Sequence, residues 1–294
     1  MEITDTQLWT ALVTPMDDEG NLHLEDLASL VHRQNEAGNG ILVLGSTGEG
    51  LALGLEDKKE VVKMAASLNI EVPLMVGVGG FNHRRQLEWI EYCQQFEVDA
   101  FLLVMPLYAK PGPKGQVQWF KTLLDAADKP CMLYNVPSRT GSKMSPFVLK
   151  ELHGHPNFAA LKEAGGSIAD YQELRKSAPE LGFYSGDDGL LPFFTMAGCN
   201  GLVSVAANVW PRATHRYTEW SLSGRGPELL PLWEECTAAM FSAPNPIPSK
   251  VLLKEKGWIS SARLRPPLTT DEIENIDLLT EADQRIQDWY HQTD

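Results

Sequence analysis

The sequence has no apolar run close to the roughly 20 residues that a transmembrane helix requires. Its first segment, MEITDTQLWTALVTPMDDEG, also lacks the basic start, the apolar stretch and the small-residue cleavage site of a signal peptide. We therefore expect no membrane partner and a cytoplasmic location.

Cysteine is scarce, and the four that occur are widely separated. They show no CxxC or CxxH spacing, which argues against a zinc site of the usual pattern; they are Cys93, Cys131, Cys199 and Cys236. Isolated cysteines in a chain of this length are typical of buried thiols in a reducing compartment.

Positive charge is the minority, with 25 basic residues against 39 acidic ones and a formal net charge of −14. Nucleic acids and anionic membranes both require a basic surface, so this balance argues against either as a partner. A small anion needs only one local Lys or Arg, and such ligands remain open.

Short apolar runs alternate with amphipathic stretches up to about residue 224. The runs lie about 20 to 33 residues apart, a spacing that suits one strand and one helix per unit. Each is apolar on both faces, as expected for a parallel strand covered on both sides. Eight such units favour a closed (β/α)8 TIM barrel over an open sheet, and no GxGxxG follows the first run. The predicted strands are Leu8–Val13, Gly40–Leu44, Pro73–Gly77, Ala100–Val104, Cys131–Asn135, Phe158–Lys162, Gly182–Ser185 and Gly201–Val205.

Beyond residue 224 the strand pattern stops. Segments 227–241, 246–257 and 271–290 have helical patterns, separated by Gly and Pro. We expect two regions: a catalytic barrel over 1–224 and a C-terminal three-helix region over 225–294.

Lys162 ends the apolar run FAAL, at the end of a barrel strand where active-site residues lie. A lysine whose amine is desolvated has a lowered pKa and attacks carbonyls to form a Schiff base. A strand-end lysine that extends to solvent is the other interpretation, and position alone favours it.

Other polar side chains follow neighbouring strands at the same predicted rim. Tyr134 ends a strand; an aromatic there usually serves packing, but a phenol beside a Schiff-base lysine could move protons if a hydroxyl orients it. Ser46, Thr47 and Tyr108 supply hydroxyls, although Gly45–Glu49 is also compatible with a simple turn. Arg139 follows the next strand, where its guanidinium could hold a carboxylate.

Two further motifs favour structural interpretations. His153 and His155 have no third metal ligand nearby, so we expect a loop feature. Asp187 and Asp188 could bind a divalent cation, but capping of the helix that follows is the favoured interpretation.

Taken together, these motifs resemble the dihydrodipicolinate synthase / N-acetylneuraminate lyase family of pyruvate-dependent class I aldolases. The resemblance spans nearly the whole chain, and YNVPSRTG is similar to the synthase branch. Ser46 departs from the threonine found in many synthases. The motifs that carry the resemblance are VTPM (13–16), GSTGEG (45–50), YNVPSRTG (134–141), LKEA (161–164), SGDD (185–188) and NPIPSK (245–250).

The resemblance implies that Lys162 forms an imine with pyruvate. The resulting enamine would attack L-aspartate 4-semialdehyde to give 4-hydroxy-tetrahydrodipicolinate, with no metal or organic cofactor. By the same resemblance Tyr134, Ser46 and Tyr108 relay protons. Substrate contacts are expected from Thr47, Arg139, Gly186 and Val203.

The resemblance also implies an oligomer, a homotetramer or a dimer, in which a neighbouring subunit supplies Tyr108. Lysine-inhibited relatives carry polar and acidic groups around an interface pocket. This chain instead matches those positions with Gly50, Leu55, Lys58, Phe81, Arg85 and Leu107, which predicts weak or absent inhibition by L-lysine.

Two alternatives remain open from the sequence. One is a lyase or aldolase of the same family acting on a sialic acid or a 2-keto-3-deoxy sugar acid. The other is a non-catalytic homologue that only binds a keto acid, although both Lys162 and Tyr134 are present.

Overall fold

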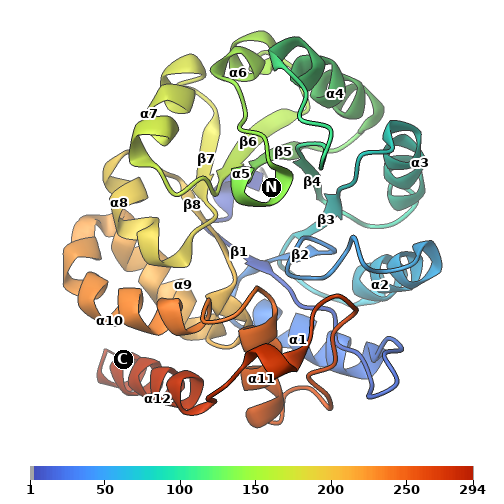
Figure 1. The fold of residues 1–294 in the computed structure, drawn as a ribbon. Helices are drawn as coiled ribbons and strands as arrows, with labels where there is room; N and C mark the ends of the chain where they lie inside the picture. Colours follow the sequence, from blue (N-terminus) through green and yellow to red (C-terminus); the bar gives the residue numbers. More distant parts are fainter. Residues whose placement is uncertain (1–2, 294) are drawn as a thin grey trace.

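The computed structural model describes residues 3–293 and has a closed barrel of parallel strands at its centre (Figure 1). The strands follow one another around the barrel in chain order, and β1 pairs with β8 to close it. Their bounds are β1 Leu8–Ala11, β2 Gly40–Val43, β3 Leu74–Val78, β4 Ala100–Val104, β5 Cys131–Asn135, β6 Phe158–Glu163, β7 Gly182–Ser185 and β8 Gly201–Ser204. The (β/α)8 prediction is therefore confirmed.

Helices surround the barrel: most form a ring outside the strands, and the one-turn helix α5 overlies the strands in this view (Figure 1). They are α1 Leu24–Glu36, α2 Leu55–Ser67, α3 His83–Cys93, α4 Pro113–Ala126, α5 Pro137–Thr140, α6 Pro146–Leu152, α7 Ile168–Ser177, α8 Leu191–Met196, α9 Pro211–Trp220, α10 Gly226–Ala239, α11 Ile247–Glu255 and α12 Asp277–Gln292. Within the described residues, no helix has both the length and the apolar character needed to span a membrane.

Two apolar layers explain why the strands are apolar on both faces. Outward-facing strand residues pack against the helices, and inward-facing ones fill the barrel. Trp9 fills the N-terminal end of the interior, and glycine leaves it room: a Cβ on Gly40 would lie 2.7 Å from the Trp9 ring. Burial of each large apolar side chain contributes roughly 1.5–3 kcal/mol.

A side chain, as well as the backbone pairing of β1 and β8, joins the first and last strands. Asn208 donates from Nδ2 to the Ala11 carbonyl at 2.8 Å and accepts the Val13 N–H at 3.0 Å. A buried amide thus links the segment after β8 to the C-terminal end of β1.

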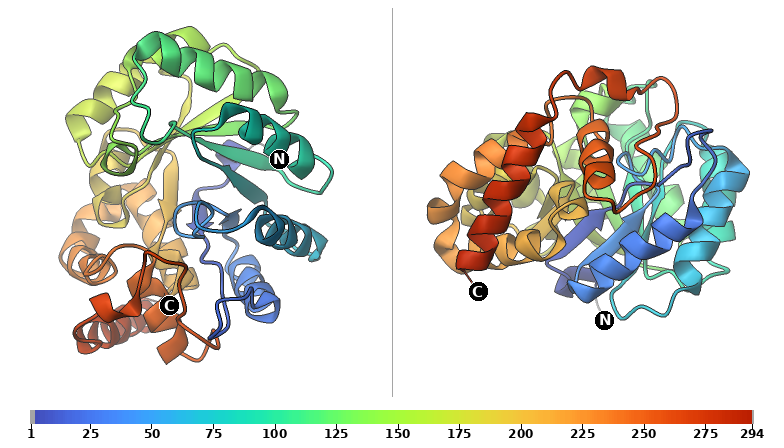
Figure 2. Two further views of the ribbon diagram at one scale, coloured as in Figure 1. Left: turned by 45° about the vertical axis from the view of Figure 1, so that its right-hand side comes forward. Right: turned by 90° about the horizontal axis from the view of Figure 1, so that it is seen from below.

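The C-terminal helices pack on one side of the barrel (Figure 1). Trp233 of α10 is fully buried between Tyr217 of α9, stacked at 4.0 Å, and Trp289 of α12, at 5.4 Å edge-on. In Figure 2 (right), the segment between α11 and α12 rises to the same end of the barrel as the loop after β5.

The last helix begins later than the sequence pattern indicates. Helix was expected from residue 271, but Thr270–Glu272 form a short 3-10 turn and α12 begins at Asp277. The Asn275 side chain accepts the Asp277 N–H at 2.8 Å, so the start of the helix is fixed by a local polar contact.

Candidate active site

A chamber of about 240 Å³ lies at the C-terminal ends of the strands. Six of the predicted site residues line it, and they come from the ends of four strands or the segments that follow them. They are Ser46 and Thr47 after β2, Tyr134 at β5, Arg139 on α5, Lys162 on β6 and Gly186 after β7.

Lys162 is only 5% exposed, which decides against the solvent-facing interpretation. Burial lowers the pKa of its amine to about 8, while the carboxylates of Asp187 and Asp188 act in the opposite direction. The neutral fraction of the amine, which can attack a carbonyl, is therefore far larger near neutral pH than that of an exposed lysine.

Tyr134 lies directly beside Lys162, because the two residues pair in the register of β5 and β6. The lysine Nζ is 4.4 Å from the centre of the phenol ring. Burial raises the pKa of Tyr134 to about 12, and a hydrogen bond with Ser46 opposes that rise. The phenol is therefore protonated at neutral pH and has an oriented hydroxyl partner.

The loop carrying Ser46 and Thr47 folds tightly back onto the end of β2. A Cβ on Gly50 would lie 2.2 Å from the Leu44 carbonyl oxygen, so only glycine fits this close approach. The Thr47 hydroxyl is buried and accepts a hydrogen bond from Asn245 Nδ2 at 2.9 Å. Residues before α11 thus contact this loop directly.

Arg139 lies on the one-turn helix α5 and is exposed at the chamber wall. Its Nη2 donates to the Asn245 carbonyl at 3.3 Å, which leaves the rest of the guanidinium free to meet an anion. Its charge also lowers the pKa of both Lys162 and Tyr134.

Gly186 leaves the space that the lysine stem occupies. A Cβ at this position would lie 2.9 Å from Lys162 Cε and 2.6 Å from Ala164 Cβ. From β8, by contrast, the lining residue is Val205, whereas the Val203 side chain is fully buried in the barrel interior. A backbone contact from Val203 to a ligand stays a prediction.

The two acidic residues after β7, Asp187 and Asp188, do not cap the helix that follows, contrary to what was expected. Asp188 accepts a hydrogen bond from Ser204 and the Val205 N–H at 3.0 Å, so it holds the turn after β8 rather than the helix that follows it. The capping interpretation is therefore wrong: Asp187 makes no side-chain cap hydrogen bond, and the Asp188 carboxylate binds N–H groups that follow the neighbouring strand β8. Asp187 lines the chamber, and its buried Oδ2 has no hydrogen-bond partner among residues 3–293.

Glu163 was not identified from the sequence, although it follows Lys162 directly. It is fully buried and accepts hydrogen bonds from Asn135 Nδ2 and the Gly165 N–H, both at 2.7 Å. Burial raises its pKa to about 7. The carboxyl group joins the ends of β5 and β6, which fixes Tyr134 and Lys162 relative to each other.

Tyr108 is not brought to Lys162 within one chain. Its side chain is 92% exposed, its φ of 66° is left-handed, and it lines a wider groove of about 660 Å³ that opens next to the chamber. Of the positions matched to the lysine-inhibitor pocket, Gly50, Lys58 and Leu107 line this groove. Burial lowers the pKa of Lys58, whose Nζ lies 4.6 Å from the Trp89 ring.

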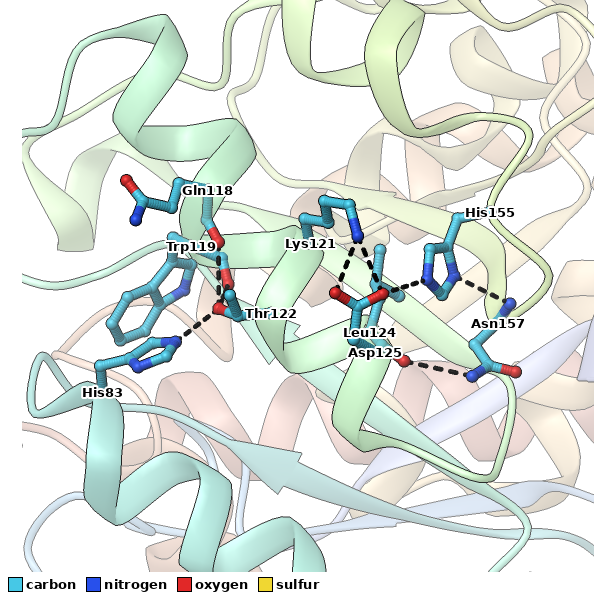
Figure 3. Close-up of polar contacts among 9 residues, drawn as sticks. All are labelled: His83, Gln118, Trp119, Lys121, Thr122, Leu124, Asp125, His155 and Asn157. Atoms are coloured by element: carbon cyan, nitrogen blue, oxygen red, sulfur yellow. Dashed lines mark hydrogen bonds and ion pairs between the residues drawn. The ribbon is translucent and has the colours of Figure 1, made fainter.

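Of the two histidines of the sequence motif, His155 lies beside α4 (Figure 3), and His153 Nδ1 contacts the Lys150 carbonyl at 2.9 Å. His155 Nε2 contacts Asp125 at 3.2 Å, and its Nδ1 accepts the Asn157 N–H at 3.1 Å. The Asn157 side chain then donates to the Leu124 carbonyl near the end of α4. Residues 3–293 contain no group of three or more His, Cys, Asp or Glu side chains arranged to hold a metal.

Comparisons with known proteins agree with this arrangement. The family model described as "Dihydrodipicolinate synthetase family" matches residues 5–283. A 4-hydroxy-tetrahydrodipicolinate synthase of Francisella philomiragia is 50% identical over 290 residues, 97% of each chain.

Solved structures with the same fold include two with informative ligands. The Acinetobacter baumannii dihydrodipicolinate synthase complexed with pyruvate has a TM-score of 0.88 and 29% identity, covering 96% of this chain and 98% of that one. The Cyanidioschyzon merolae DHDPS with lysine bound has a TM-score of 0.88 and 29% identity, covering 97% and 99%. With a family model matched from residue 5 to 283 and a half-identical relative along nearly its full length, this chain belongs to the dihydrodipicolinate synthetase family.

Proposed function

We propose that this protein is a 4-hydroxy-tetrahydrodipicolinate synthase, which condenses pyruvate with L-aspartate 4-semialdehyde through a lysine Schiff base. The observation that carries the proposal is the buried amine of Lys162, with its pKa lowered to about 8 and the Tyr134 ring 4.4 Å away. The name of the Francisella relative and the pyruvate complex of the Acinetobacter enzyme support the choice of reaction and first substrate.

In the first half of the reaction, the neutral Lys162 amine attacks the C2 carbonyl of pyruvate. The carbinolamine loses water to give an imine, and loss of a methyl proton gives the enamine. The protonated imine nitrogen accepts the electron pair released from the methyl C–H bond.

In the second half, the enamine carbon attacks the aldehyde carbon of L-aspartate 4-semialdehyde, whose oxygen takes a proton. The amino group of the semialdehyde then attacks C2 and closes the ring. The Lys162 amine leaves as the ring forms, and the free enzyme is regenerated.

The proposed proton relay consists of Tyr134, Ser46 and Tyr108. The hydrogen bond between Tyr134 and Ser46 supports the first link. Tyr134 would give a proton to the carbinolamine oxygen as it leaves as water, and would take one from the pyruvate methyl group. Ser46 would carry protons between Tyr134 and the outside.

Substrate carboxylates are assigned to two sides of the chamber. The backbone N–H groups of Ser46 and Thr47 would hold the pyruvate carboxylate, and Arg139 would hold that of the semialdehyde. We also assign substrate contacts to Gly186 and Val203, through the backbone. These roles agree with the lining of the chamber by all of these residues except Val203.

Tyr108 would reach the relay from a second copy of the chain, in a homotetramer or dimer. Its 92% exposure and left-handed backbone are consistent with a side chain held outward for a neighbour. Leu51 and Phe81, both exposed, would be covered by the same contact. We place the enzyme in the cytoplasm, in keeping with its four buried free thiols.

Inhibition by L-lysine is expected to be weak or absent. A structure of the Cyanidioschyzon enzyme has lysine bound, but in this chain Arg85 is matched to a position where inhibited relatives carry an acidic residue, which removes a partner for the ligand's ammonium and adds repulsion. Steady-state rates measured over a range of L-lysine concentrations test this. Half-inhibition below 1 mM would contradict it.

The test of the proposed function has two parts. Borohydride reduction with pyruvate, followed by mass spectrometry, should label Lys162, and a Lys162→Ala variant should not be labelled. Consumption of pyruvate with L-aspartate 4-semialdehyde, coupled to a dihydrodipicolinate reductase, should occur only in the native protein. Labelling without turnover would point to a sugar-acid lyase of the same family, and no labelling of the folded protein would leave only a keto-acid binder.

A further inference from the structure

A lysine from the C-terminal region is completely buried against Glu49, in the loop that follows β2. Lys250 of α11 has no exposed side-chain surface, and its Nζ lies 2.6 Å from Oε1 of Glu49. The same ammonium donates to the Arg263 carbonyl at 2.7 Å. The second Glu49 oxygen accepts the Arg265 N–H at 2.7 Å, so both ends of the pair are hydrogen-bonded.

Glu49 belongs to the loop that carries Ser46 and Thr47. Its backbone is left-handed, with φ of 54°, and its N–H donates to the Ser46 carbonyl at 3.1 Å. The backbone of Glu49 is therefore tied to the Ser46 peptide within one turn. The loop has little other freedom, because Gly48 and Gly50 are in close contact with the backbone of Leu44.

A second contact reaches the same loop from the same C-terminal segment. Asn245 donates to the Thr47 hydroxyl at 2.9 Å and accepts from Arg139 at 3.3 Å. The six-residue segment from Asn245 to Lys250 thus contacts residues of both proposed carboxylate sites.

Stability alone does not account for a charged pair at this place. Desolvating two charges costs energy that their attraction often fails to recover, and well-packed apolar residues of similar size are frequently at least as stable. An apolar pair, however, would make no directional contacts. The ion pair at Oε1 of Glu49, the hydrogen bond that Oε2 accepts and the one that the Lys250 ammonium donates fix the position of the loop more narrowly than dispersion contacts do.

We propose that Lys250 is a positioning residue for pyruvate, acting through Glu49 to hold the N–H groups of Ser46 and Thr47 where they meet the substrate carboxylate. The inference rests on the proposed function, since it assigns a support to that site. It gives the C-terminal region a part in substrate binding although none of its helices carries the Schiff-base lysine.

The test measures pyruvate binding separately from condensation. The pyruvate concentration that half-saturates borohydride labelling of Lys162 is determined for the native protein, for Lys250→Met and for the double variant Glu49→Gln/Lys250→Met. Lys256→Met is the matched control, because Lys256 lies on the C-cap of the same helix and pairs with Asp283, away from the loop.

Both Lys250 variants should raise the half-saturating concentration about tenfold or more, as a displaced binding group would. The labelling rate at saturation and its pH midpoint should stay close to the native values, since Lys162 itself is untouched. Lys256→Met should leave all three quantities unchanged. The double variant contains no unpaired buried charge, so its thermal unfolding and circular dichroism identify a folded sample.

A folded double variant with native half-saturation would overturn the inference. A double variant that does not fold would also overturn it, by making the pair a requirement of folding rather than of positioning. If the native protein is not labelled at all, the proposed function fails first, and that outcome is recognisable before any variant is made.

Discussion

The chamber and the groove lie side by side at one end of the barrel, but a single chain completes only the first. The chamber is lined by residues from seven of the eight strands or the segments that follow them, and a buried amine, a buried phenol and the Asp187 carboxyl group face it. The groove is larger and leaves Leu51 and Tyr108 largely exposed. The difference indicates that one chain supplies the groups proposed for imine formation, Lys162 and Tyr134. The proposed relay also needs Tyr108, which would come from a second chain that covers the groove.

The largest expected effect comes from filling the space beside the lysine. Gly186→Ala places a Cβ 2.9 Å from Lys162 Cε, so the stem must move and the amine leaves its position beside Tyr134. We expect the rate of pyruvate labelling to fall about 100-fold. Rapid-quench borohydride labelling measures this rate.

A glycine in the groove supplies the matched control for that variant. In Gly79→Ala the new Cβ meets only the side-chain ends of Val104, at 3.1 Å, and Leu51, at 3.6 Å. Labelling of Gly79→Ala at the native rate would confirm the contrast between the chamber and the groove. Equal losses of labelling rate in both variants would show that an added Cβ disturbs the chamber no more than the groove.

The next effect separates the two substrates. Arg139→Ala removes the guanidinium proposed for the semialdehyde carboxylate but leaves Lys162 and the Ser46 loop in place. We expect kcat/KM for the semialdehyde to fall about 10- to 100-fold, and pyruvate labelling to change much less. Equal losses in the two assays would count against the role assigned to Arg139.

A smaller effect is expected from disturbing the groove alone. Leu51→Glu places a charge on an exposed apolar surface, which should dissociate the proposed oligomer. Sedimentation should then report monomers, with turnover reduced about tenfold because Tyr108 is no longer delivered. Pyruvate labelling of Lys162 should persist. Full turnover by a monomeric variant would remove Tyr108 of a neighbour from the relay.

The smallest effect is a shift in pH dependence. The neutral amine that forms the imine predominates above the Lys162 pKa of about 8, so labelling should rise with pH and level off above that value. The Asp187 carboxylate raises this pKa, and Asp187→Asn removes its charge. The midpoint should therefore move to lower pH, by about one unit. A midpoint that is unchanged or moves to higher pH would show that Asp187 does not stabilise the charged amine.

Local signals in the sequence were sufficient for the barrel and for much of the chamber. Buried parallel strands must be apolar on both faces, so the runs themselves mark the strands, and β4, β5 and β7 begin and end as predicted. Parallel strands also deliver their carboxyl ends to one rim, which is why Lys162 and Tyr134 could be placed together before any coordinates.

Contacts between distant segments could not be predicted in the same way. Glu49 and Lys250 meet because a helix after the barrel folds back over the loop following β2, and neither residue stands out by spacing or periodicity. Asp188 shows the same limit: its carboxylate turns to β8 instead of the adjacent helix. A side chain's choice between near and far N–H groups depends on packing that only the folded chain determines.

Closure of the barrel between β1 and β8 has a consequence for folding during synthesis. The first strand to leave the ribosome has its second neighbour, and the Asn208 amide that joins them, near the other end of the barrel sequence. At about 5–20 residues per second, β1 waits roughly ten seconds or more with one edge unpaired. During that interval the nascent chain exposes a β-strand edge, so chaperone occupancy on stalled ribosomes should be highest before residue 208 emerges and fall once it does.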